Sequence, residues 1–147
     1  MRPPDYIALT VDALDASAVI DFVSDGAAGG IAVFLGITRS ERSADGRDLI
    51  ALDYEAYEEM ALKQMRELAT EARQRWPAVK LALLHRIGRV EIAKPSVIIA
   101  VSTPHRSDAF ECCRFLIDEL KKSVAIWKKE VWSDGSGTWV HPVTNHP

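Results

Sequence analysis

One amphipathic run, residues 108–124, constrains the fold of this chain most, because its apolar residues recur with a helical period and cations stand at both of its ends. At 100° per residue, these apolar residues fall on one face of a helix: Phe110, Cys113, Ile117, Leu120 and Val124. Lys121 lies at the edge of that face, about 80° from its centre, whereas Lys122 points to the far side. The run therefore predicts a helix that packs the stem of Lys121 along the core and leaves its amine at the rim.

The cations around this helix indicate an anion-binding active site. His105 and Arg106 precede its first turn, where free backbone N–H groups can also hold an anion. Lys128 follows the end of the helix after a short segment. Two amines brought close together lower each other's pKa, which makes one of them usable as a base or nucleophile near neutral pH. The alternative is a basic surface patch made of Lys121, Lys122, Lys128 and Lys129, in which Lys121 is an ordinary surface lysine.

The rest of the chain predicts an α+β fold with a mixed, largely antiparallel sheet, two main helices and one short N-terminal helix. Strand patterns occur at 6–11, 31–35, 49–57, 79–85, 90–92 and 96–102, and further helical patterns occur at 15–22 and 58–76. Hairpins are expected between 79 and 102, so a doubly wound fold is disfavoured. We expect a single domain over residues 1–147, with a frayed tail at 141–147.

A polar segment, residues 38–48, is expected to be a mobile loop that is closed by a turn at Asp45–Gly46. Arg39 lies at its start, three residues after Gly36, and glycine there allows a ligand to approach the backbone closely. Arg39 and Arg106 could each bind a phosphate through two N–H groups. The alternative for Arg39 is a solvated loop cation.

The composition excludes several functional classes. With 147 residues and a net charge of −3, the chain can form one core but lacks the broad positive surface of a nucleic-acid or membrane binder. No segment has the pattern of a membrane span or a signal peptide. The adjacent Cys112 and Cys113 do not suit a mutual disulfide, which fits a reducing cytoplasm; Cys113 is expected in the core, and nothing supports a catalytic thiol at Cys112. The histidines and cysteines lack metal-ligand spacing, so no metal site is expected.

Seven short pieces of the sequence, taken in order, form a specific pattern, although each piece alone is a weak signal. They are 34–39, 52–57 with Met60–Ala61, 85–88, 101–110, 117–121, 126–130 and Trp139–Val140. The fourth piece contains H-R-x-x-A-F, and the fifth and sixth together give L-K-x(5)-W-K. From about residue 26 to residue 140, the chain resembles the large, catalytic subunit of molybdopterin synthase.

This resemblance implies an α/β-hammerhead-like α+β fold and a role in molybdenum cofactor biosynthesis. It implies a homodimer at the core of a heterotetramer, in which each large subunit binds one small ubiquitin-like sulfur-carrier subunit. The Gly-Gly tail of the carrier ends as a thiocarboxylate and enters a pocket of the large subunit. Two sulfur atoms pass to cyclic pyranopterin monophosphate and form the dithiolene of molybdopterin. Because the carrier supplies the sulfur, no cofactor is implied for this chain.

The resemblance also assigns roles to individual residues. Lys121 and Lys128 match the catalytic lysines of the family. The substrate-binding positions match Ile37, Thr38, Arg39, His105, Arg106, Lys129 and Glu130.

Three departures from the family pattern lead to expectations of their own. The family commonly has proline where this chain has Ala125, which is expected to loosen the turn into Lys128. A glycine usual near Ala93 is absent, and Lys94–Pro95 is expected to form a different turn. An arginine that some relatives carry in the tail has no counterpart in residues 141–143.

Two other functions fit the same residues. One is a relative with this fold that acts on a different anionic substrate, and the other is a non-catalytic module that docks a ubiquitin-like carrier tail. A docking module needs cations only at its rim, whereas Lys121 at the core edge near a second lysine favours catalysis. Two points stay open: which lysine is the base, and whether the Arg39 loop acts in its own subunit or in its neighbour's.

Overall fold

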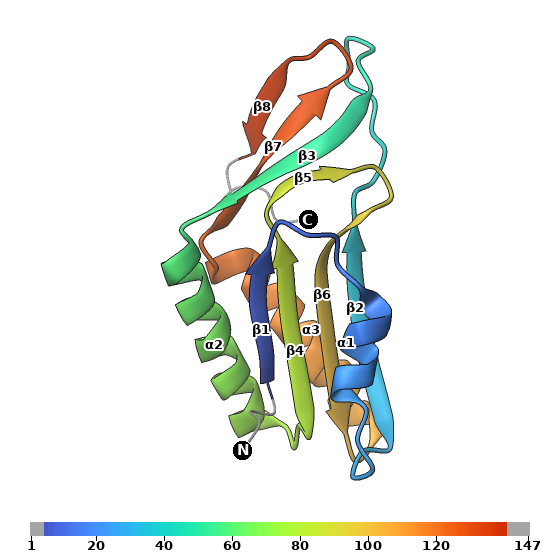
Figure 1. The fold of residues 1–147 in the computed structure, drawn as a ribbon, viewed down its shortest axis with the longest axis vertical. Helices are drawn as coiled ribbons and strands as arrows, with labels where there is room; N and C mark the ends of the chain where they lie inside the picture. Colours follow the sequence, from blue (N-terminus) through green and yellow to red (C-terminus); the bar gives the residue numbers. More distant parts are fainter. Residues whose placement is uncertain (1–4, 141–147) are drawn as a thin grey trace.

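The computed structural model describes residues 5–140, and within them three helices and eight strands form two sheets (Figure 1). The strands are β1 (Asp5–Thr10), β2 (Gly30–Ile37), β3 (Leu49–Ala56), β4 (Lys80–Arg86), β5 (Gly88–Glu91), β6 (Pro95–Thr103), β7 (Ile126–Trp132) and β8 (Gly137–Val140). The helices are α1 (Ala16–Val23), α2 (Glu58–Arg75) and α3 (Arg106–Ser123). The α+β class is confirmed, but the strands divide between two sheets. None of the three described helices is long and apolar enough to cross a membrane.

The first sheet has the order β1-β4-β6-β2 and is covered on both faces. β1 runs parallel to β4, and the other pairs are antiparallel. Alternate residues of β4 and β6 enter two separate cores, as the two-residue period of a strand requires. Leu83 and Ile99 face α2 and α3, whereas Leu84 and Ile98 face α1. In Figure 1, α1 lies in front of this sheet and α3 behind it.

The second sheet has the order β5-β3-β7-β8, is antiparallel throughout, and caps one end of the first (Figure 1). The prediction of hairpins between residues 79 and 102 is wrong in part. β4 and β6 do pair antiparallel, but β5 leaves them and pairs with β3, with Val90 opposite Leu52. Gly88 has a φ of +86°, a conformation that L side chains rarely adopt, and it marks the point where the chain crosses between the sheets.

The predicted stripe of α3 is buried except at Phe110, and the buried face extends further round the other side of the helix. Its buried residues are Ala109, Cys112, Cys113, Leu116, Ile117 and Leu120. Phe110, which was expected in the core, is 64% exposed. The difference arises because α3 packs against both β6 and α2, which makes its buried arc wider and turns it away from Phe110. Burial raises the pKa of Cys112 to about 12 and that of Cys113 to about 11, so neither thiol is a nucleophile at neutral pH.

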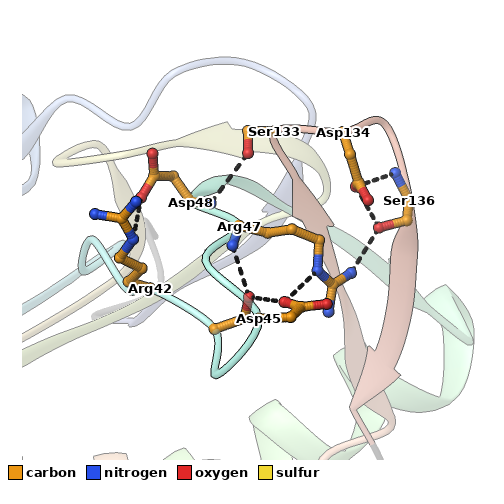
Figure 2. Close-up of polar contacts among 8 residues, drawn as sticks. Arg42, Asp45, Arg47, Asp48, Ser133, Asp134 and Ser136 are labelled. Atoms are coloured by element: carbon orange, nitrogen blue, oxygen red, sulfur yellow. Dashed lines mark hydrogen bonds and ion pairs between the residues drawn. The ribbon is translucent and has the colours of Figure 1, made fainter.

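Polar contacts hold the loop between β2 and β3 (Figure 2), and its expected mobility stays a prediction. The expected turn is confirmed, because Gly46 has a φ of +88° and its N–H donates to the Ser43 carbonyl. The guanidinium of Arg47 donates to Ser136 Oγ at 2.7 Å, and the backbone N–H of Asp48 donates to Ser133 Oγ at 3.0 Å. These bonds tie the loop to the β7–β8 turn.

The turn between β5 and β6 anchors Thr38. Ala93 donates its backbone N–H to the Thr38 carbonyl at 2.8 Å, and the Thr38 N–H donates to the Lys94 carbonyl at 3.1 Å. Ala93 has a φ of +67°, a left-handed conformation that favours glycine. Ala93 therefore adopts, under strain, a backbone conformation that glycine favours.

We predict that Ala93→Gly stabilises the fold by about 0.5–1 kcal/mol, because the left-handed conformation costs an L residue roughly 1–2 kcal/mol and the freer unfolded chain of glycine offsets part of the gain. Calorimetry should show a Tm higher by about 2–3 °C. Ala18→Gly, at an exposed position of α1, is the matched control and should lower the Tm, because glycine weakens a helix. A lower Tm for Ala93→Gly would contradict a strained turn.

Candidate active site

The turn that joins α3 to β7 brings Lys121 close to Lys128. Lys121 lies in the last turn of α3, and β7 begins at Ile126. The backbone N–H of Ala125 donates to Gln64 Oε1 at 2.7 Å, and the Ala125 carbonyl accepts the N–H of Tyr57 at 3.1 Å. A proline could not make the first of these bonds. The turn is therefore held to α2, and the loosening expected from Ala125 is not seen.

The alternation of β7 separates the cations that follow the turn. Lys128 pairs with Tyr54 and Lys129 with Asp53 on β3, so their side chains leave opposite faces of the sheet. The amine of Lys129 lies 5.5 Å from the centre of the Trp139 ring, on the outer face. Lys128 shares the inner face with Glu130. The structure therefore places Lys129 on the face opposite to Lys128, and its part in substrate binding stays a prediction.

Two cavities meet at the lysine pair, and both Lys121 and Lys128 line each of them. The outer cavity has a volume of about 260 Å³ and is also lined by residues 34–39 and by Glu41, Leu49, Leu52, Tyr54, Ser96, Val97 and Glu130. The inner cavity has a volume of about 80 Å³ and is also lined by His85, Leu120, Ile126, Trp127 and Val140. A larger, shallow depression of about 770 Å³ lies on the solvent side of α2 and contains none of the predicted site residues.

Neither lysine of the pair has an anionic partner within residues 5–140. Lys122, the neighbour of Lys121, by contrast contacts Glu119 at 3.4 Å. Partial burial lowers the pKa of Lys121, and the positive charge of Lys128 lowers it further. Two amines without an ion-pair partner within 4 Å, at the junction of two cavities, form a site prepared for an anion.

The outer cavity also contains carboxylates and a buried hydroxyl. Arg39 and Glu41 are paired at 3.3 Å, and both are exposed. Burial raises the pKa of Glu130, Glu41 raises it further, and Lys128 opposes the shift. Thr38 is only 3% exposed, and its Oγ1 has no hydrogen-bond partner in the described part of the chain. An unpartnered buried hydroxyl is costly, and it marks a place where a ligand can complete the hydrogen bonding.

His85 is a residue of this site to which the sequence pattern assigned no role. It lies on β4, is 5% exposed, and packs edge-on against Tyr54 with ring centres 4.9 Å apart. Burial lowers the pKa of His85 to about 4, with smaller contributions from the charges of Lys121 and Lys128. Its place at the end of a buried strand was visible in the sequence, but its neighbours come from distant segments.

The structure brings six of the nine predicted site residues to one cavity and leaves three elsewhere. Lining the outer cavity are Ile37, Thr38, Arg39, Lys121, Lys128 and Glu130. His105 and Arg106 are exposed at the start of α3, and Lys121 is near its end. An 18-residue helix is about 27 Å long, so these residues cannot share a pocket within one chain. Among the described residues, no group of three or more potential metal ligands is found.

Comparison with known proteins identifies the family. The family model described as MoaE protein matches residues 9–123, which include Lys121 but stop short of Lys128. The chain belongs to the MoaE protein family. It is 46% identical over 134 residues to molybdopterin synthase catalytic subunit 1 of Aedes aegypti, covering 90% of this chain and 85% of that one. It is 42% identical over 137 residues to the molybdopterin synthase catalytic subunit of a Nostoc species, covering 92% and 82%.

Solved structures share the MoaE fold described above. Molybdopterin synthase from Staphylococcus aureus superposes with a TM-score of 0.84 at 32% identity, covering 90% of this chain and 95% of that one. A complex of subunits 1 and 2 of the molybdopterin-converting factor from Helicobacter pylori has a TM-score of 0.76 at 22% identity, covering 99% and 94%. The second likeness is one of fold alone.

We predict that Lys128→Gln raises the pKa of Lys121 toward that of an ordinary lysine, because it removes the positive charge that disfavours the ammonium form. The pKa can be followed by NMR of the Lys121 side chain through a pH titration. Lys122→Gln is the matched control and should leave the titration unchanged, because Lys122 pairs with Glu119. An unchanged or lower pKa in Lys128→Gln would show that the two amines do not interact.

Proposed function

We propose that this chain is the catalytic subunit of a molybdopterin synthase, a sulfurtransferase that converts cyclic pyranopterin monophosphate to molybdopterin. The names of its relatives support this activity. The observation that carries the proposal in this chain is the unpaired Lys121–Lys128 pair, which lines two adjoining cavities.

The charges of the two substrates match this pair. The precursor carries a cyclic phosphate and the donor ends in an anionic thiocarboxylate, so two anions must meet in one place. Lys121, whose pKa is lowered, is the better candidate for the proton transfers that sulfur insertion requires, and Lys128 supplies fixed positive charge beside it. The sulfur comes from the donor, so the buried, unreactive thiols of Cys112 and Cys113 have no part in the transfer.

The sizes and linings of the two cavities match the two substrates, a pterin and an extended peptide tail. The outer cavity is close to the lower end, about 300 Å³, of small-molecule sites, and Arg39 and the unpartnered Thr38 hydroxyl can bind polar groups of the pterin there. The inner cavity is narrow and walled by Ile126 and Trp127, which suits an extended glycine tail without side chains. In this assignment, donor and acceptor reach the lysine pair from opposite sides.

A second copy of the chain supplies His105 and Arg106 in our proposal. β2 is an edge strand with no described strand on its outer side, and its exposed apolar residues include Ile31, Val33 and Leu35. Antiparallel pairing of β2 with its copy across a two-fold axis sets the start of one strand beside the end of the other. A Cβ atom added at Gly30 would lie 3.3 Å from the Cα of Arg106. The start of the partner's α3 is thereby brought close to Arg39, which completes the outer cavity.

We predict that Lys121→Ala lowers the rate of molybdopterin formation by about 10²–10⁴, the usual contribution of a general acid or base, and leaves the fold intact. The assay uses the purified carrier thiocarboxylate and the pterin precursor, with circular dichroism as the check on folding. Lys122→Ala is the matched control and should retain wild-type turnover. Undiminished turnover in Lys121→Ala would instead favour a docking module whose chemistry lies elsewhere.

We predict that two inactive variants restore each other when they form mixed dimers. In a dimer of Lys121→Ala with Arg106→Ala, shared sites place both defects in one site and leave the other complete. An equal mixture contains about one half mixed dimers, so activity should recover to about a quarter of the wild-type value after subunit exchange. No recovery, with mixed dimers verified by mass spectrometry, would mean that Arg106 acts with the lysines of its own chain or with none.

A further inference from the structure

His85 occupies the wall of the inner cavity, and neither the family resemblance nor the proposed chemistry gives it a role. Along β4 it follows the same alternation as Leu81 and Leu83, whose side chains face α2 and α3. It lines the inner cavity together with both lysines. The imidazole is therefore held by the strand at the wall of the inner cavity.

The hydrogen bonding of His85 fixes which ring nitrogen carries the proton. Its Nδ1 lies 2.7 Å from the carbonyl oxygen of Arg86. A carbonyl oxygen only accepts, so Nδ1 must be the protonated nitrogen of the neutral ring, and Nε2 presents a lone pair. With its pKa lowered to about 4 by burial, the ring stays neutral at physiological pH. No described group donates a hydrogen bond to Nε2.

The side chains that line the inner cavity offer few hydrogen-bond acceptors. Its walls are apolar at Leu120, Ile126 and Val140, and its other polar side-chain groups, the two lysine amines and the Trp127 indole, are all donors. Within this lining, Nε2 of His85 is the side-chain acceptor. A ligand that fills the cavity and displaces its water must therefore offer an N–H or O–H to that nitrogen as well as an anion to the lysines, or leave the acceptor without a hydrogen bond.

We propose that His85 determines specificity for the sulfur donor, by accepting at Nε2 a hydrogen bond from a backbone N–H of the carrier's Gly-Gly tail while the lysines hold the anionic end of that tail. An extended peptide offers one N–H per residue, and glycine adds no Cβ that would fill the narrow cavity. The inference rests on the proposed function and adds to it the group that positions the donor. It concerns the carrier and not the pterin.

The first test separates the two substrates. His85→Phe keeps the ring that packs on Tyr54 and removes the acceptor, and it should raise the KM for the carrier thiocarboxylate about fivefold, the value of one neutral hydrogen bond, without changing the KM for the pterin precursor. His85→Gln keeps an acceptor oxygen and should recover part of the loss. Equal carrier KM values for wild type and His85→Phe would overturn the proposal, as would an equal rise in the KM for the precursor.

The second test does not depend on a variant that folds. Full-length carrier in its carboxylate form, made by peptide ligation with an N-methyl group on either of the last two glycine nitrogens, serves as a competitive inhibitor of the wild-type enzyme. Methylation at one of the two positions should weaken inhibition about fivefold, and the penalty should shrink in His85→Phe. The same penalty in both proteins, or none in either, would overturn the role of His85. Absence of any molybdopterin formation by the wild type would instead refute the proposed function.

Discussion

The pairing of β7 with β3 is the interaction on which the site depends. α3 delivers Lys121 at its last turn, and only the immediate return of the chain along β3 sets Lys128 beside it. Register matters as much as proximity, because a shift by one residue would exchange Lys128 for Lys129 on the inner face. The hydrogen bond from the Ala125 N–H to Gln64 Oε1 fixes the point at which that register begins.

The electrostatics of the site follow from this arrangement. Several other cations of the described chain have a carboxylate partner, such as Arg73 with Asp5 at 2.8 Å or Arg89 with Asp53 at 2.8 Å. The lysine pair has none, and the charge of Lys128 raises the free energy of the charged form of Lys121. Such a pair lowers the stability of the protein without ligand, and a bound anion offsets this loss. The neutral His85 limits that cost, because it adds no third positive charge to the inner cavity.

The sequence was most informative where a local period applies. The periodicity of α3 distinguished Lys121, which lines both cavities, from Lys122, which does not, although both residues are exposed. It also placed Phe110 in the core, where the structure exposes it, because the direction of packing is a tertiary property. The alternation of β7 already implied that Lys128 and Lys129 face opposite sides, a constraint that outweighs their adjacency in a motif.

Other features could not be read from one chain's sequence. The family pattern groups His105 with Lys121, yet they lie at opposite ends of one helix, and only an assembly of two chains can unite them. His85 belongs to one piece of the family pattern but received no role from the sequence, because its neighbours Tyr54 and both lysines come from three other elements. The strained turn at Ala93 likewise becomes visible only through its backbone angle and its bonds to Thr38.

A crystal structure of the dimer with the pterin precursor bound tests the central claim most directly. The account predicts the precursor in the outer cavity, with Lys121 and Lys128 of one chain and Arg106 of the other within about 3 Å of its oxygen atoms. A precursor bound away from both lysines, or amines that point to open solvent with the outer cavity empty, would contradict it.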